Sequence, residues 1–132
     1  MPQFPVTPSR EKVLAQIPDY AVEISPARGS VTVRIRGQVV AASEQALIIA
    51  ETKHAPVFYL PRDDVRMAYF ERTDHSTYCP FKGHASYWSF KHGGDVEENV
   101  VWIYEDPYPE VAGLKNYLSF YTDRAQVAFV EK

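Results

Sequence analysis

Short segments of alternating apolar and polar residues, separated by glycine and proline, make up most of this chain from about residue 21 onward. In VTVRIRGQVVAAS, Val31, Val33 and Ile35 alternate with polar residues, and Gly37 supplies a tight turn into the next apolar pair. ALIIAE and PVFYL have the length and composition of further strands. The pattern predicts a mainly β protein, folded as a single compact antiparallel β-rich domain.

One or two short helices are expected between the strands. Pro61 stands before RDDV, and proline is well tolerated at the first position of a helical turn. A second short helix is expected at about 109–116, followed by extended segments at 117–121 and 127–130.

The length of 132 residues is that of one domain. Prolines at positions 2, 5 and 8 indicate an extended N-terminal arm over residues 1–20, with a possible short helix at 10–17. The β-rich domain is then expected to cover residues 21–132.

The composition excludes several classes of protein. A net charge of -3 gives no overall field that would attract phosphate backbones, so no nucleic-acid partner is expected. No apolar run approaches the roughly 18 residues of a membrane span, and the N-terminus lacks the apolar core of a secretory signal, so we expect a cytoplasmic protein with no membrane partner. The single cysteine excludes an intrachain disulfide and any zinc site built from several cysteines.

The segment TDHSTYCPFKGHASYW, residues 73–88, concentrates the groups that can carry chemistry. Proline and glycine in CPFKGH predict a four-residue hairpin loop at 80–83, closed by Cys79 and His84. Because side chains alternate along strands, this register places His75, Cys79, His84 and Trp88 on one face.

KHGGDV predicts a second hairpin, with Gly93 and Gly94 as a two-residue loop. The resulting three-stranded meander over 73–104 would add Glu97 and Asn99 to the same face, with Asn99 beside Trp88. The reverse face would carry an aromatic set suited to a core: Tyr78, Tyr87, Val100, Trp102 and Tyr104.

Cys79 has two interpretations, and both stay open. A thiol next to His84 and Lys82 would have its thiolate favoured, as a nucleophile requires. His75 is a weaker partner, because four residues of straight strand separate it from the cysteine by about 13 Å, although it could still carry protons. Against this, a lone cysteine often packs as a small hydrophobe. A metal held by the cysteine and both histidines lacks a supporting motif, so no metal and no cofactor is expected.

A ligand site is also expected on the polar face. Arg62, at the start of a helical turn, could receive a carboxylate or phosphate, although it could instead pair with Glu51 or a neighbouring aspartate. In this interpretation Trp88 stacks on the ligand, and Arg62, Lys82 or Asn99 fixes its polar end. We expect the face to lie in a cleft with Arg62 or Glu51 nearby.

Three longer motifs, ETKHAPVFYLPRDDV, TDHSTYCPFKGHASYW and YLSFY, closely resemble those of a family known as domain of unknown function 427, over roughly residues 28–130. The resemblance implies a compact β-rich domain similar to the β-tent group. The better-known members of that group bind zinc through two C-x-x-C pairs, which this chain lacks. The family is sometimes described as nucleotidyltransferase-like, but Gly29-Ser30 is not followed here by the Asp-x-Asp that would hold magnesium.

The sequence leaves three classes of function, in order of preference. The first is a module that binds a small polar or anionic ligand on the 73–104 meander. The second is a thiol-dependent enzyme that uses Cys79 with His84 or His75. The third is a non-catalytic interaction domain. The sequence does not indicate the oligomeric state.

Overall fold

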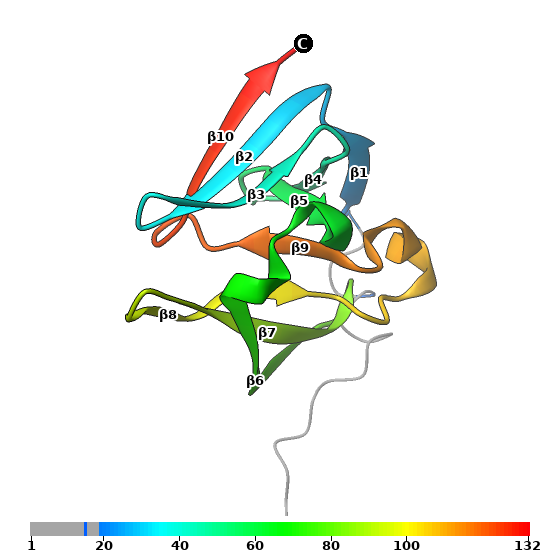
Figure 1. The fold of residues 1–132 in the computed structure, drawn as a ribbon. Coiled ribbons are helices and arrows are strands. Elements are labelled where there is room, and N and C mark those ends of the chain that lie inside the picture. The colour runs from blue at the N-terminus through cyan, green and yellow to red at the C-terminus, as the bar shows by residue number, and fades with distance from the viewer. Residues whose placement is uncertain (1–14, 16–18) are drawn as a thin grey trace, which may run out of the picture.

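The structure is a computed structural model, and it describes residue 15 and residues 19–132. Ten antiparallel strands lie in these residues, so the expected mainly β fold is confirmed (Figure 1). The strands are β1 (Val22–Pro26), β2 (Gly29–Ile35), β3 (Gln38–Ser43), β4 (Leu47–Glu51), β5 (Val57–Pro61), β6 (Phe70–Cys79), β7 (Gly83–His92), β8 (Asp95–Ile103), β9 (Tyr117–Phe120) and β10 (Gln126–Glu131). The expected helix at 10–17 falls outside the described residues, apart from residue 15.

The expected helical segments are confirmed as short 3-10 helices. They are η1 (Arg62–Asp64), η2 (Met67–Tyr69) and η3 (Pro109–Leu114). Proline opens η3 and also precedes η1, because its fixed φ suits the first position of a helical turn.

The strands form two sheets. One has seven strands in the order β1-β4-β5-β9-β8-β7-β6, and the other has three in the order β10-β2-β3. The inward residues of β2, Val31, Val33 and Ile35, are fully buried in a core that also takes residues from β5, β7, β8 and β9. The smaller sheet therefore covers one face of the larger one (Figure 1).

The β2–β3 hairpin follows the expectation from sequence. Arg36 and Gly37 form its two-residue turn with φ values of 49° and 83°. Positive φ at both central residues gives the twist that matches the strands of a tight hairpin.

The three-stranded meander β6–β7–β8 is also confirmed, together with its second turn. Gly93 and Gly94 adopt φ values of 59° and 85°, and His92 pairs with Asp95 as expected. The first turn is different: Cys79 pairs with Gly83, not with His84. The loop has three residues, because the Lys82 N–H donates to the Cys79 carbonyl at 3.2 Å and Gly83, at φ 115°, already belongs to β7.

This one-residue difference reverses the expected faces. Cys79 lies on the same face as Tyr87 and Trp102, whereas His84 and Trp88 lie on the other. The prediction that Cys79 and His84 share a face is therefore wrong.

A bulge in β8 changes a second expected pair. Asn99 has a φ of 50°, and its N–H donates to the Ser89 hydroxyl at 2.9 Å. Beyond this bulge Trp88 pairs with Val101, so the prediction that Asn99 lies beside Trp88 is wrong.

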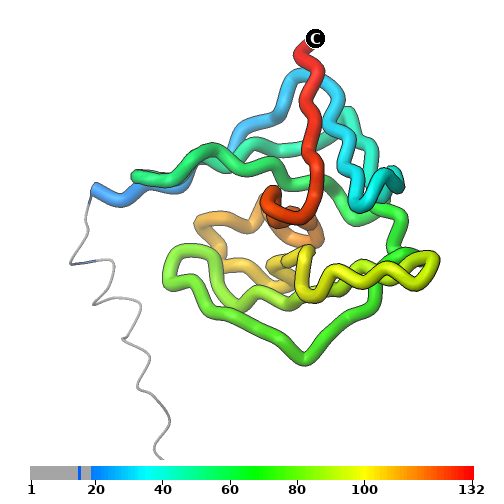
Figure 2. Tube along the Cα trace, turned by 90° about the vertical axis from the view of Figure 1, so that its left-hand side faces the viewer, coloured from blue at the N-terminus to red at the C-terminus, as the bar shows by residue number. Residues whose placement is uncertain are grey.

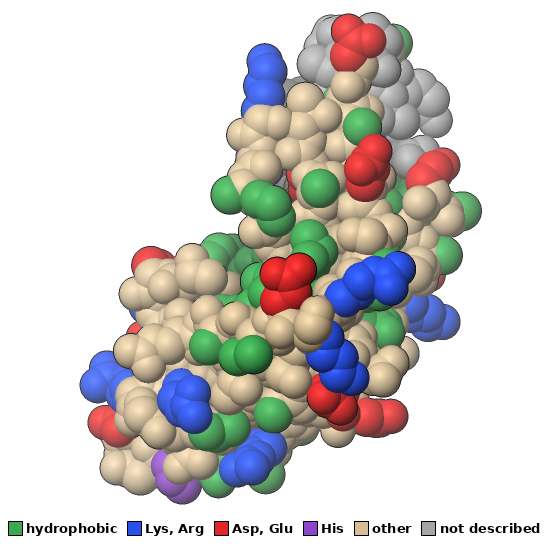
Figure 3. Space-filling model, turned by 90° about the horizontal axis from the view of Figure 1, so that it is seen from above, with side chains coloured by type: hydrophobic (Ala, Val, Ile, Leu, Met, Phe, Trp, Pro, Cys, Tyr) green, Lys and Arg blue, Asp and Glu red, His purple; other side chains and the backbone are tan. Residues whose placement is uncertain are grey.

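The face of the molecule that Figure 3 shows carries charged side chains of both signs. On the face seen from above in Figure 3, acidic and basic side chains are interspersed. No helix among the described residues is long and apolar enough to cross a membrane.

The contact between β2 and β10 gives a testable prediction about the smaller sheet. A β-carbon on Gly29 would lie 2.2 Å from the carbonyl oxygen of Val130, so Gly29→Ala must push β10 away. We expect the free energy of unfolding, measured by urea denaturation, to fall by about 1–3 kcal/mol. Gly113→Ala is the matched control, because its nearest neighbour would be Ile24 Cδ1 at 4.0 Å. Equal stability of the two variants would contradict this account.

Candidate functional site

The face of the seven-stranded sheet that carries Cys79 is rich in tyrosine, and we call it the tyrosine face. It is formed by Tyr59 on β5, Cys79 on β6, Tyr87 on β7, Trp102 on β8, Tyr104 just after β8, and Tyr121 just after β9. The face turns away from the smaller sheet, and η3 covers part of it through Val111 and Leu114.

Hydrogen bonds and ring contacts hold these aromatic side chains in place. Trp102 Nε1 donates to the Tyr59 hydroxyl at 3.0 Å, and the Trp102 and Tyr121 ring centres lie 4.6 Å apart. The Tyr87 hydroxyl lies 3.2 Å from the Tyr121 hydroxyl and 2.9 Å from Thr77 Oγ1. The rings are therefore fixed by partners on four different strands.

Three phenols of this face, those of Tyr59, Tyr104 and Tyr121, have a raised pKa. Burial raises the pKa of Tyr59 and of Tyr104 well above the ordinary value. Burial and the hydrogen bond with Tyr87 raise the pKa of Tyr121 to about 12. The tyrosine face thus offers hydroxyl groups and ring surfaces without phenolate charge.

Charge enters the site through Lys82, in the loop between β6 and β7. Lys82 is only 6% exposed, and it is the one buried charged residue in the part of the chain that the structure describes. Its ammonium group donates to a carboxylate oxygen of Glu51, at the end of β4, and lies 6.0 Å from the ring centre of Tyr104. Its carbonyl accepts from the Tyr108 N–H at 3.0 Å, which anchors the loop.

Glu51 is the acceptor at the centre of this cluster. It accepts hydrogen bonds from Lys82 and from the hydroxyl of Tyr20, which precedes β1. Burial alone would raise the pKa of Glu51, but these two hydrogen bonds and the Lys82 charge outweigh it and hold the pKa below 4.5. Glu51 and Lys82 therefore form an ion pair between a buried lysine and a half-buried carboxylate.

This ion pair requires a strongly curved sheet. Three strands, β5, β9 and β8, lie between β4 and β7 in the sheet order. In a flat sheet β4 and β7 would be about 19 Å apart. Stacking of Tyr20 on Phe81, at 3.9 Å between ring centres, joins the start of β1 to the same loop. In Figure 2 the green turn after β4 and the light-green turn between β6 and β7 lie on the same side of the molecule.

Cys79 lies beside the ion pair and is half-buried. Its sulfur is 3.9 Å from the Lys82 nitrogen, and Tyr59 and Tyr104 are close enough to interact with it electrostatically. The thiol thus has a lysine as its neighbour in place of the expected histidine.

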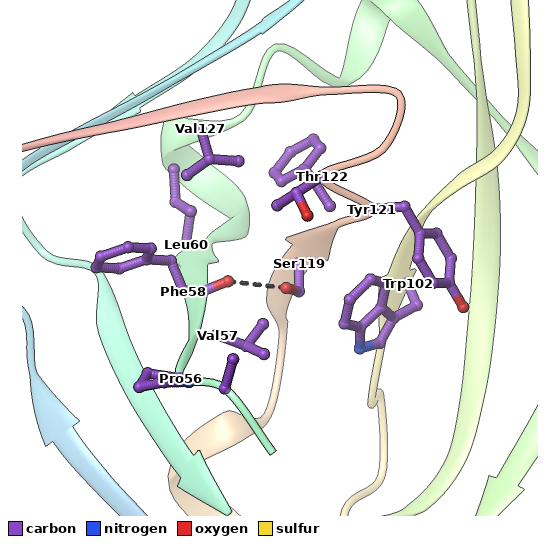
Figure 4. Close-up of a pocket in the computed structure, with 11 residues that line it drawn as sticks. Pro56, Val57, Phe58, Leu60, Trp102, Ser119, Tyr121, Thr122 and Val127 are labelled. Carbon is purple, nitrogen blue, oxygen red and sulfur yellow. Dashed lines mark hydrogen bonds between the residues drawn. The ribbon is translucent and has the colours of Figure 1, made fainter.

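A cavity of about 310 Å³ opens where β5 and β9 separate, between the end of the tyrosine face and Val127 of the smaller sheet. The two strands pair only at Leu60–Leu118 and Pro61–Tyr117. Beyond these pairs the Ser119 hydroxyl donates to the Phe58 carbonyl at 2.8 Å (Figure 4). The cavity is lined by Ala55, Pro56, Val57, Phe58, Leu60, Trp102, Ser119, Phe120, Tyr121, Thr122 and Val127, none of them charged.

The expected catalytic residues are not assembled as predicted. His84 lies on the opposite face from Cys79, where its ring contacts Tyr78 at 4.8 Å. His75 is exposed at an irregularity of β6 and contacts the Tyr87 ring at 4.5 Å. No three His, Cys, Asp or Glu side chains among the described residues come together in a way that could hold a metal.

The expected ligand-binding residues are divided between the two faces. Arg62 lies over the Trp88 ring at 5.1 Å, and Trp88 packs against the core between the sheets. Asn99 accepts a hydrogen bond from Thr73 at 2.6 Å. Of the five expected ligand-binding residues, Lys82 contacts Cys79 and Glu51 pairs with Lys82, so the structure brings part of the expected set together on a different face.

The sequence pattern assigned Trp102 and Tyr104 to a core and indicated no ligand-binding role for Tyr59 or Tyr121. The available signal was the number of tyrosines, nine in 132 residues, together with their alternation on strands. That signal does not separate a buried aromatic core from an aromatic site, because both have the same spacing.

Loss of the Lys82 charge should be costly. Lys82→Met would leave the half-buried Glu51 carboxylate without its partner, and we expect the free energy of unfolding to fall by about 3 kcal/mol. The control is Lys91→Met, which removes an exposed ion pair with Glu71 at 2.7 Å and should cost less than about 1 kcal/mol. Chemical denaturation of both variants measures the free energy of unfolding. Similar losses in the two variants would show that the Glu51–Lys82 pair stabilises the fold no more than an exposed pair does.

The lowered pKa of Glu51 also predicts a pH dependence. A carboxyl group whose pKa is lower in the folded chain contributes stability in full above its unfolded pKa, and loses that contribution as pH falls through the folded value. The stability advantage of the wild type over Glu51→Gln should therefore be constant near neutral pH and shrink below about pH 4.5. Denaturation curves from pH 7 to pH 3 test this; an advantage that persists at the acid end would contradict it.

Comparison with known proteins identifies the family but no activity. No curated protein matches the chain. The family model described as domain of unknown function (DUF427) matches residues 23–131, which include every described strand except the first residue of β1. The chain therefore belongs to the family described as domain of unknown function 427.

Proposed function

We propose that this domain binds a small ligand with a flat, uncharged ring in the cavity between β5 and β9. The observation that carries the proposal is the cavity itself: about 310 Å³ of space beside Trp102, with no charged side chain in its lining. Ligand sites are typically apolar and aromatic, with a few polar groups that set orientation, and this volume is at the small end of their range.

The placement of Trp102 favours a stacked ring over a hydrogen-bonded one. The Trp102 Nε1–H group already donates a hydrogen bond to the Tyr59 hydroxyl, so the indole offers a ligand only its ring surface. In Figure 4 Trp102 lies between Ser119 and the Tyr121 ring, which supports it from the side away from Ser119. A ring fixed in this way loses little side-chain entropy when a ligand packs on it.

Few polar groups are free to orient the ligand. The Ser119 hydroxyl is donated to the Phe58 carbonyl, whereas Thr122 is exposed at the edge of the cavity. The chemistry favours a ligand with one or two hydrogen-bonding groups and no net charge. This differs from the polar or anionic ligand expected from sequence, because Arg62 and Lys82 do not line the cavity.

The thiol-dependent alternative receives less support. His84 and Cys79 lie on opposite faces of the hairpin, so His84 cannot take the proton of the thiol. A non-catalytic interaction domain is the outcome to expect if the cavity binds nothing.

Two probes of similar size but different charge test the proposal. Benzamide is neutral and benzoate is anionic, and NMR amide shifts at Val57, Phe58 and Thr122 report on the cavity. We expect benzamide to shift these amides saturably and to bind more tightly than benzoate. Trp102→Leu should weaken benzamide binding by about tenfold or more, about 1.4 kcal/mol.

Trp88→Phe is the matched control. Trp88 packs on the other face of the sheet, and its buried Nε1 has no hydrogen-bond partner in the described chain, so benzamide binding should be unchanged. Preference for benzoate that disappears in a Lys82→Met variant would place an anion site at Lys82 and contradict the proposal. Shifts that are absent with both probes would favour the interaction domain.

A further inference from the structure

The contact between Cys79 and Lys82 brings the ammonium group of a lysine to the only thiol of the chain. Lys82 Nζ lies 3.9 Å from Cys79 Sγ, and the turn between them is closed by the Lys82 N–H bond to the Cys79 carbonyl. A flexible lysine side chain can shorten this distance to bonding range without movement of the backbone.

Burial makes this contact unusual. A lysine that is 6% exposed has given up most of its hydration, which is costly unless the charge is paired. Its partners here are the Glu51 carboxylate on one side and the thiol on the other. Cys79, by contrast, is half-buried, and oxidation by peroxides favours cysteines that keep some exposure.

We propose that Cys79 and Lys82 form a reversible sulfur–nitrogen crosslink, a sulfenamide, when the protein meets a peroxide. The crosslink would be a modification site at the β6–β7 loop, and it does not depend on ligand binding in the cavity between β5 and β9.

The chemistry balances with a peroxide as the oxidant. Hydrogen peroxide converts the Cys79 thiol to a sulfenic acid and is itself reduced to water. The Lys82 ammonium loses a proton to solvent water, and the lone pair of the resulting amine attacks the Cys79 sulfur. The sulfur–oxygen bond breaks as the sulfur–nitrogen bond forms, and the hydroxide leaves as water with a proton from the nitrogen. A thiol reductant reverses the step by attacking the sulfur.

Two competing products are restricted by the sequence. A sulfenic acid can condense with a backbone nitrogen, but the residue after Cys79 is Pro80, whose nitrogen carries no hydrogen. An intrachain disulfide cannot form either, because the chain has one cysteine. Lys82 is therefore the amine best placed to trap the oxidised sulfur.

Crosslinking would change the charge of the site. The sulfenamide nitrogen is no longer an ammonium group, so Glu51 loses the cation with which it pairs. The oxidised protein should be less stable than the reduced one, and a thiol reductant should restore its stability.

Mass spectrometry after mild hydrogen peroxide treatment tests the proposal directly. The crosslinked protein should be lighter by two hydrogen atoms, about 2 Da, and dithiothreitol should restore the original mass. Trypsin cuts after Lys82 in the reduced chain, giving peptides 73–82 and 83–91. A crosslinked Lys82 blocks this cut, so the oxidised chain should give a joined 73–91 peptide, which contains no methionine to confuse the mass.

Lys82→Arg is the matched variant, since arginine keeps the charge beside Glu51 but does not form the amine. We expect it to add oxygen at Cys79 and to show no loss of about 2 Da. Lys53→Arg, an exposed lysine, should behave as the wild type does. Oxidised wild type that carries only added oxygen at Cys79, with normal cleavage after Lys82, would overturn the proposal. The wild-type digest decides the question even if Lys82→Arg does not fold.

Discussion

The ion pair between Glu51 and Lys82 is the contact that the arrangement of the site depends on. It joins the end of β4 to the loop between β6 and β7, although three strands lie between β4 and β7 in the sheet. Tyr20 supports it through a hydrogen bond to Glu51 and a stacked contact with Phe81. A seven-stranded sheet that is closed in this way must curve, and the tyrosine face is the side on which these contacts form. Burial of the pair costs hydration, which the hydrogen bonds to Glu51 offset.

The opposite end of the tyrosine face is shaped by a loss of strand pairing. β5 and β9 share two residue pairs and then separate, so the Ser119 side chain supplies a hydrogen bond that the ladder no longer makes. The space that opens is lined by apolar groups and by Trp102. The site therefore has a charged end and a neutral end, connected by aromatic rings whose hydrogen bonds hold them in place.

Local chemistry explains which parts of the fold could be predicted from the sequence. The Gly93–Gly94 turn was predictable in register, because two-residue hairpin loops require positive φ and glycine provides it. CPFKGH was ambiguous, since Gly83 can end a four-residue loop or begin a strand after a three-residue one. The hydrogen bond from the Lys82 N–H to the Cys79 carbonyl closes the three-residue loop. Compared with the four-residue loop, this register reverses the face on which the thiol lies. The β8 bulge at Asn99 had no comparable signal in the sequence.

The Glu51–Lys82 pair was beyond sequence reasoning for a different reason. Its partners are 31 positions apart, one at the end of β4 and the other in the loop between β6 and β7, so neither alternation nor turn chemistry connects them. A double-mutant cycle tests most directly whether the two side chains stabilise the fold as a pair. It uses chemical denaturation of Glu51→Gln, Lys82→Met and the double variant. This account predicts a coupling free energy of at least about 2 kcal/mol between the two side chains. A coupling below about 0.5 kcal/mol, the value expected of independent sites, would contradict it.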